Sequence, residues 1–286
     1  MSLLLTQTLN GLTFASLLFL MASGFTLIFG LMRVPNMAHG ALFMLGAYLA
    51  VTLLGADLPF AVAALLAAVL VGVLGVFVER VILARIAGNE LAQVLATLGI
   101  AFVIADACRA AWGGMPLEVA SPEWLSGTTT FAGTVFPLYR LFVVGVAVAI
   151  AIALDRSLSR TTLGARLRAA VDDRVMARAV GIPVDRLFVA TFFAGAALVG
   201  LAGVIGAPIL SVFPGLDMEV LPLVLIVVVL GGTGSIPGAF LGSVLTGFVY
   251  SFGQTLLPEL SYVLLFVPMI AVLALRPQGL CGRKPS

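Results

Sequence analysis

Few side chains in this sequence have types and spacings that could do chemistry, and most of them stand alone. The single histidine, His39, follows Asn36 in a short polar break and has no nearby carboxylate or cysteine. Cys108 and Cys281 show no metal-ligand spacing. Within the apolar runs there are no paired carboxylates and no serine with a lysine or histidine partner. The sequence therefore predicts neither a metal site nor covalent catalysis.

Nucleotide chemistry is excluded by two further observations. The only lysine is Lys284, close to the end of the chain, so no G-x-x-x-x-G-K-[ST] phosphate loop exists. The glycine-rich stretch 232–238 does not match G-x-G-x-x-G, because Pro237 occupies the last glycine position. The chain itself is therefore expected to hydrolyse no ATP and to bind no dinucleotide.

The composition explains why reactive groups are scarce. Of 286 residues, 62% are hydrophobic and only 10% are charged, with a net charge of +2. The mean hydropathy is +1.21, whereas soluble domains carry about 25% charged residues. These values exclude an ordinary soluble enzyme, a disordered protein and a nucleic-acid-binding protein, and they predict a polytopic membrane protein.

Long apolar runs give the expected membrane spans. They are too long for barrel strands and do not alternate, so all are predicted to be helices. The predicted spans are 11–32, 36–55, 59–79, 91–112, 137–154, 187–210, 218–231, 236–256 and 260–275. The run 218–231 is short for a full crossing and could be a re-entrant segment, so eight and nine spans both stay open. We expect an all-α polytopic membrane protein with 8–9 transmembrane helices, and a single domain over residues 1–286.

The basic residues predict which loops face the cytoplasm. Segment 155–186 holds seven arginines, and loop 79–90 and the C-terminal tail are also basic. Loops 113–136 and 211–219 carry acidic residues and neither lysine nor arginine. The three basic segments, with the C-terminus, are therefore predicted to be cytoplasmic. Nine crossings would then place the N-terminus outside. Arg140, near the outer end of its span, is expected to snorkel toward water.

The segment 161–187 is the most informative polar stretch. Thr161 or Thr162 can cap a helix, and Gly181 with Pro183 can end it. Between them lies an approximate apolar stripe, which predicts one amphipathic helix over about 164–182. The residues of the stripe are Leu167, Ala170, Val171, Val175 and Ala179. A loop that contacts anionic lipid and a docking helix for a cytoplasmic partner are both compatible with this pattern. Mixed charge and the lack of an aromatic residue before Phe188 favour docking.

Polar groups at membrane depth are functional candidates because hydrocarbon does not solvate them. Asn36 and His39 either hydrogen-bond the break after Pro35 or line a path or gate. Asp106 and Arg109 share a helix face and are predicted to form a structural ion pair. The break at 231–238 is expected near the cytoplasmic face, as an inner gate or a second contact with a partner. Glycines in the sixth span are expected to allow close helix packing.

Four stretches, in order along the chain, resemble the branched-chain amino acid permeases of ABC importers (the LivH/LivM type). The stretch 36–48 resembles the family's N-x-A-H-G motif and the helix after it, and 231–239 resembles its G-G-x-G-S-x-x-G-A segment. Residues 276–280 resemble its R-P-x-G-L. The segment at about 155–186 resembles its cytoplasmic coupling loop, in the order Ala-Ala, Asp, Ala, Gly-Ile over residues 169–182. The residues assigned to that loop are Gly164, Arg168, Ala169, Ala170, Asp172, Asp173, Ala177, Gly181 and Ile182. The pathway or gate candidates are Asn36, His39, Gly40, Gly232, Gly234 and Ser235.

The resemblance implies a membrane subunit that moves a branched-chain or related small amino acid by alternating access. It implies a second homologous permease, two cytoplasmic ATPase subunits that use ATP and Mg²⁺, and an external solute-binding protein. It further implies a bacterial inner membrane and no cofactor held by this chain. An ion-driven secondary transporter or channel is the alternative, although Asp106 is the only carboxylate near mid-span. A permease for urea or amides is another alternative.

Overall fold

The structure is a computed structural model that describes residues 2–32, 35–131 and 133–282. In these residues each predicted span corresponds to an apolar helix, so the all-helical multi-pass prediction is confirmed. The helices are α1 Ser2–Met32, α2 His39–Gly55, α3 Phe60–Val81, α4 Glu90–Trp112, α5 Leu138–Arg160, α8 Val184–Gly206, α9 Leu216–Gly231, α10 Ile236–Leu256 and α11 Ser261–Leu275. Seven segments of the described residues are long and apolar enough to cross a membrane. Helix α11 reaches that length together with the turn Pro258–Leu260 before it, whereas α2 and α9, with 17 and 16 residues, do not.

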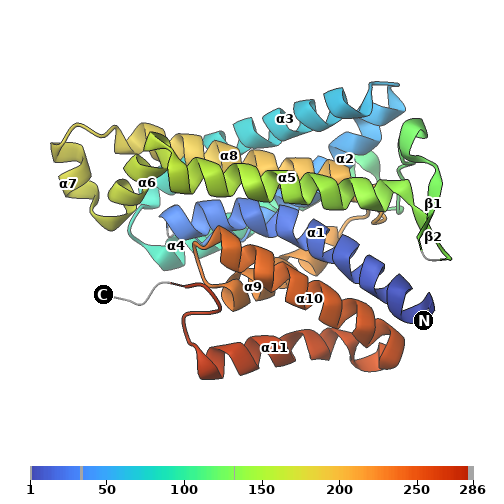
Figure 1. Cartoon of the computed structure of the whole chain (residues 1–286). Coiled ribbons are helices and arrows are strands. Elements are labelled where there is room, and N and C mark those ends of the chain that lie inside the picture. The colour runs from blue at the N-terminus through green and yellow to red at the C-terminus, as the bar shows by residue number, and fades with distance from the viewer. Residues whose placement is uncertain (1, 33–34, 132, 283–286) are drawn as a thin grey trace.

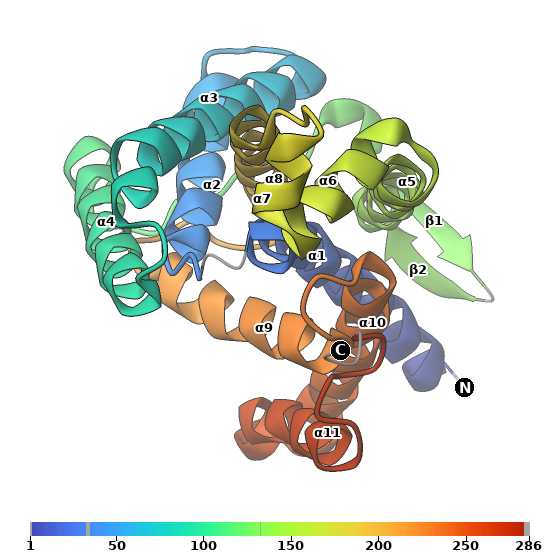
Figure 2. The ribbon, with the colours of Figure 1, turned by 90° about the vertical axis from the view of Figure 1, so that its left-hand side faces the viewer.

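Helix α1 lies in the centre of the bundle, with α5, α8, α9 and α10 around it (Figure 2). Its neighbours approach closely because small residues face one another, as predicted for the glycines of the sixth span. A Cβ at Gly195 of α8 would lie 2.8 Å from the carbonyl oxygen of Gly24 in α1. A Cβ at Gly247 of α10 would lie 2.6 Å from Cβ of Ala15. Larger side chains at these positions would force the helices apart.

The two short helices begin inside the bundle, which explains their length. His39, the first residue of α2, lies 2.9 Å from the carbonyl oxygen of Met21, in the middle of α1. The backbone of Asp217, in the first turn of α9, contacts Gly40 of α2. Helix α9 is strongly tilted relative to α5 and α8. Figure 2 shows α9 from the side, whereas α5 and α8 are seen nearly end-on. Surrounding protein covers these helix starts, as non-helical backbone at membrane depth requires.

The polar connections gather at the two ends of the bundle (Figure 1). One end, here called the basic end, carries helices α6 Thr162–Asp172 and α7 Arg174–Ala179, the 3-10 turn η1 Leu83–Ile86 and the C-terminal segment. The three basic segments thus share one end, as the sidedness prediction requires. Which side of the membrane this end faces stays a prediction. Arg283 and Lys284 of the basic tail lie outside the described residues.

The opposite end contains a small β-hairpin, although the sequence pattern predicts only helices and loops. Strands β1 Thr128–Phe131 and β2 Thr134–Pro137 pair antiparallel, with Phe131 opposite Thr134. The short turns η2 Glu123–Leu125 and η3 Pro258–Leu260 lie in the loops of the same end. An isolated bridge between Leu117 and Val212 joins the two acidic loops. Both strands contain β-branched residues, threonine in both and valine in β2, and such residues favour strands.

Candidate functional site at the α6–α7 hairpin

Helix α6 folds back against the end of α5. The Thr161 hydroxyl accepts a hydrogen bond from the Gly164 amide at 3.2 Å, so Thr161 caps the helix as predicted. Gly164 is buried directly against the backbone of Leu158, where any side chain would overlap. The Arg168 guanidinium donates to the carbonyl oxygen of Leu158. Gly164 and Arg168 therefore fix the angle between α5 and α6.

The segment forms two helices, so the prediction of one helix over 164–182 is wrong. Asp173 has an extended backbone and separates α6 from α7. Its carboxylate oxygen Oδ1 accepts hydrogen bonds from the amides of Val175 and Met176, each at 2.9 Å. The aspartate side chain thus starts a new helix in place of continuing the old one. The break also ends the predicted stripe, because Ala177 is buried in α7 whereas Val175 is 80% exposed.

Helix α7 ends at Gly181, as predicted. Gly181 has a φ of +84°, which favours glycine. Its amide donates to the carbonyl of Arg178 and the Ile182 amide donates to that of Ala177, both at 3.0 Å. This pair of bonds is the Schellman motif. An ion pair of 2.6 Å between Arg178 and Asp185 then links α7 to the start of α8.

The inner face of the hairpin belongs to a hydrophobic core shared with three membrane helices. Ala170 and Ala177 are almost fully buried against Ile28 of α1, Val78 of α3 and Phe192 of α8. The outer face is different. Asp172 and Ala169 are exposed, and so is an apolar patch on and after α7. This α7 patch consists of Val175, Met176 and Val180, with exposed fractions of 80%, 61% and 67%.

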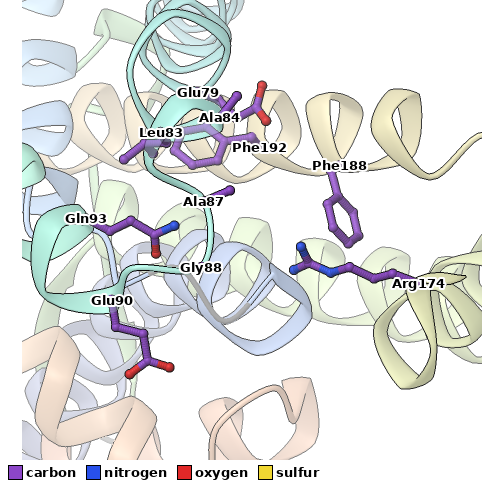
Figure 3. A pocket seen from close by; sticks show the side chains of 10 residues that line it. All are labelled: Glu79, Leu83, Ala84, Ala87, Gly88, Glu90, Gln93, Arg174, Phe188 and Phe192. Carbon is purple, nitrogen blue, oxygen red and sulfur yellow. The ribbon is translucent and has the colours of Figure 1, made fainter.

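A cavity of about 280 Å³ lies beside α7, between the η1–α4 connection and α8. Figure 3 shows Arg174 extending from α7 toward Phe188, and Gln93 reaching toward the same space from α4. The guanidinium carbon of Arg174 is 4.6 Å from the centre of the Phe188 ring, a cation–π contact. The Oε2 atom of Glu79 is buried and has no hydrogen-bond partner among the described residues. One carboxylate oxygen of a residue that lines the cavity therefore lacks a hydrogen-bond donor.

The gate candidates before α2 hold α1 and α2 together. Because a carbonyl only accepts, Nε2 of the fully buried His39 carries the proton that it donates to Met21. The Asn36 side chain accepts from the Ala38 amide at 3.1 Å. However, His39 Nδ1 and Asn36 Nδ2 are buried without a partner among the described residues. The polar side chains at this break are thus only partly hydrogen-bonded.

The gate candidates between α9 and α10 pack against two other segments at the basic end. A Cβ at Gly234 would come within 3.1 Å of Gly30 in α1. Ser235 caps α10 by accepting from the Gly238 amide at 3.1 Å. The C-terminal segment covers the end of α9, because the amides of Leu280 and Cys281 donate to the carbonyls of residues 230 and 231, each at 2.9 Å. Gly232 is packed against this segment, with Gln278 O 2.7 Å from an added Cβ.

Comparison with known proteins identifies the chain. A family model described as "Branched-chain amino acid transport system / permease component" matches residues 7–273. This chain belongs to that family. It is 32% identical to the high-affinity branched-chain amino acid transport system permease protein BraD of Pseudomonas aeruginosa, over 98% of this chain and 96% of BraD. It is 28% identical to the corresponding LivH of Escherichia coli K12, with the same coverage. No solved structure matches the chain.

As a branched-chain amino acid transport permease, the chain is a multi-pass membrane component of an ABC transport system and is not itself an enzyme. Two of its family-like motifs, 231–239 and 276–280, meet in the structure, and the motif at 36–48 contacts the start of α9. The turn 231–238 contacts both the 276–282 segment and Gly30. Gly40 contacts the start of α9. These sequence motifs therefore mark close backbone contacts between helices.

Two predictions about charged residues of the permease differ from the structure. Asp106 and Arg109 are both exposed, and the one ion pair among the described residues joins Arg178 to Asp185. The predicted ion pair between Asp106 and Arg109 does not form, because both side chains point away from the bundle. Arg140 does not snorkel freely: it is half-buried and donates to the Asn10 side chain of α1. The described residues contain no group of three potential metal ligands.

Proposed function

We propose that this permease imports branched-chain or closely related small amino acids by alternating access. Two separate ATPase subunits, which use ATP and Mg²⁺, drive the movement by binding the α6–α7 hairpin. The observation that carries the proposal is the construction of this hairpin. It is capped at both ends, anchored in the membrane-helix core and carries the exposed apolar patch of α7.

The anchoring makes the hairpin suitable for transmitting force. Ala170 and Ala177 pack against α1, α3 and α8 in one core. Helix α5 leads directly into α6, and α8 begins five residues after α7 ends. A displacement of α7 must therefore move α8 and the neighbouring helices, because a close-packed core does not deform continuously.

The exposed surface suits a protein partner better than a lipid surface. The α7 patch consists of aliphatic and methionine side chains, and residues 161–187 include three aspartates and no aromatic residue. An interfacial lipid-binding helix would instead combine lysine or arginine with tryptophan or phenylalanine. The cavity beside α7 adds polar lining residues, among them Glu90, Gln93 and Arg174. Apolar patch and polar cavity together resemble a docking surface.

The proposal includes the remaining assembly and its orientation. A second homologous permease completes the membrane part, and an external solute-binding protein delivers the amino acid. The basic end faces the cytoplasm of a bacterial cell, and the membrane is the inner membrane. The clustering of the three basic segments at that end supports this orientation.

The test is a double substitution, Val175→Glu with Val180→Glu, in the complete importer. We expect the ATPase subunits to stop co-purifying with the permease and ATP-driven leucine uptake into vesicles to fall to background. The matched control is Met115→Glu, because Met115 is 76% exposed in a loop at the opposite end. The control should keep the ATPase subunits bound. Retention of the complex by the double variant, or uptake driven by an ion gradient without ATP, would refute the proposal.

A further inference from the structure

A second cavity lies at the opposite end of the bundle from the hairpin. Its volume is about 350 Å³, and its walls come from the first half of α1, the start of α5 and the end of α10. Figure 1 shows these three segments side by side at the end away from α6 and α7. The volume falls at the lower end of the range for small-molecule sites.

Arg140 is the only charged residue that lines this cavity. The side chain is half-buried, and Asn10 is its only hydrogen-bond partner among the described residues. Its guanidinium carbon lies 5.9 Å from the centre of the Phe136 ring. No carboxylate of the described residues lies within ion-pair distance of it. An arginine carries five N–H donors in a planar fork that fits a carboxylate, so most of its donors lack a protein acceptor here.

The rest of the lining divides into a neutral polar part and an apolar part. Ser251 of α10 donates to the Gln7 side chain at 2.8 Å, and Gln254 donates to the Tyr250 hydroxyl at 2.8 Å. Phe14, Leu17 and Ile209 supply apolar surface. A cation, neutral hydrogen-bonding groups and an aliphatic surface therefore face one small volume.

From this arrangement we infer that the cavity is an entry site for the transported amino acid. The α-carboxylate binds the guanidinium of Arg140, the neutral polar groups meet the ammonium, and the aliphatic side chain lies against Phe14, Leu17 and Ile209. Asn10 is a positioning residue, because its amide holds the guanidinium at the cavity wall. This inference rests on the proposed function and adds the binding site and the chemical feature it recognises.

Asn10→Asp is the decisive substitution. The side chain keeps its size, and the new carboxylate stays beside Arg140 and occupies it permanently. If the Arg140–Asn10 contact only joins α1 to α5, the variant should fold and transport as well as the wild type, because a charge-assisted bond is stronger. If Arg140 binds solute, the variant should fold normally and lose leucine uptake by tenfold or more. Arg140→Lys, which keeps the charge without the fork, should lose less.

A direct binding experiment distinguishes the amino acid from other anions as the ligand of this cavity. Millimolar leucine should raise the melting temperature of the purified wild-type permease–ATPase complex, because a ligand that binds the folded state stabilises it. Leucinamide, which lacks the carboxylate, should not, and neither ligand should stabilise the Asn10→Asp complex. Stabilisation by inorganic phosphate or phosphatidylglycerol vesicles, but not by leucine, would assign the site to a phosphate group and overturn the inference.

The external binding protein supplies the remaining control. The solute-loaded protein should stimulate ATP hydrolysis by wild-type and Asn10→Asp complexes at the same half-maximal concentration. A tenfold rise in the half-maximal concentration for the variant would show that Arg140 contacts a carboxylate of the binding protein, and this would overturn the inference. Unchanged leucine uptake by the variant would overturn it as well. Failure of the proposed function would look different, because the wild-type complex itself would then show no ATP-driven uptake.

Discussion

Removal of the Asp173 cap should loosen α7 by an amount that the structure allows us to work out. Asp173→Ala deletes the acceptor of two amide hydrogen bonds at 2.9 Å. Loss of such a cap costs about 1 kcal/mol, which corresponds to about a fivefold change in an equilibrium constant. Helix α7 has only six residues. Outside the core it is otherwise held by the two C-terminal bonds at Gly181 and Ile182, the Arg174–Phe188 contact and an exposed ion pair worth at most about 1 kcal/mol. The cap is therefore a substantial part of its local stability.

Hydrogen exchange followed by mass spectrometry on the purified complex in detergent measures this effect. In Asp173→Ala, the backbone amides of Ala177 and Val180 should exchange about fivefold faster than in the wild type. Asp173→Asn should keep the wild-type rate, because asparagine caps a helix as well as aspartate does. Asp172→Ala is the matched control, since Asp172 is exposed and caps no helix. Equal effects of Asp173→Ala and Asp173→Asn would show that charge, not capping, holds α7, and the reasoning would be wrong.

Three other changes test the packing, the break before α2 and the orientation. Gly46→Leu should abolish the monodisperse peak in size-exclusion chromatography, because Gly46 lies against the backbone of α8. Gly145→Leu should keep the peak, because a Cβ at Gly145 meets open space. Similar profiles for the two variants would contradict the packing. His39→Ala should lower the free energy of unfolding by about 1–3 kcal/mol, since the buried Met21 carbonyl loses its donor; an unchanged denaturation midpoint in detergent would contradict this. An impermeant maleimide should label the exposed Cys281, and not the buried Cys108, in inside-out vesicles only; labelling in right-side-out vesicles would reverse the orientation.

The sequence predicted those features that depend on local pattern. Apolar runs located every membrane helix of the described residues, because hydrocarbon requires long uninterrupted apolar segments. Gly181 ended α7 as predicted, since a left-handed turn followed by proline is encoded within a few residues. The short run 218–231 also signalled an unusual helix, and the structure shows that α9 starts inside the bundle.

Features that depend on contacts between distant segments were not predictable. Asn10 and Arg140 are 130 residues apart, and neither residue alone indicates a shared cavity. The C-terminal segment covers the end of α9, although its sequence has no periodicity that would place it there. Asp173 was predicted to lie within a helix, because the approximate apolar stripe runs past it from Leu167 to Ala179. The sequence does contain a relevant signal, because an aspartate side chain can accept hydrogen bonds from the backbone amides that follow it. Such capping and helix continuation are close in free energy, so the pattern alone does not decide between them.

Helix α1 connects the core beneath the α6–α7 hairpin with the cavity at the opposite end of the bundle. Helix α1 contributes Ile28 to the core beneath the hairpin, and Asn10, Phe14 and Leu17 to the cavity at the opposite end. A shift of α1 along or about its axis would therefore change both places at once. An importer needs this kind of coupling, because the ATPase can move solute only if the two arrangements of the hairpin differ in their affinity for the solute. At Gly24 and Gly195, and at Ala15 and Gly247, small residues bring α1 close to α8 and α10, which suits small sliding movements.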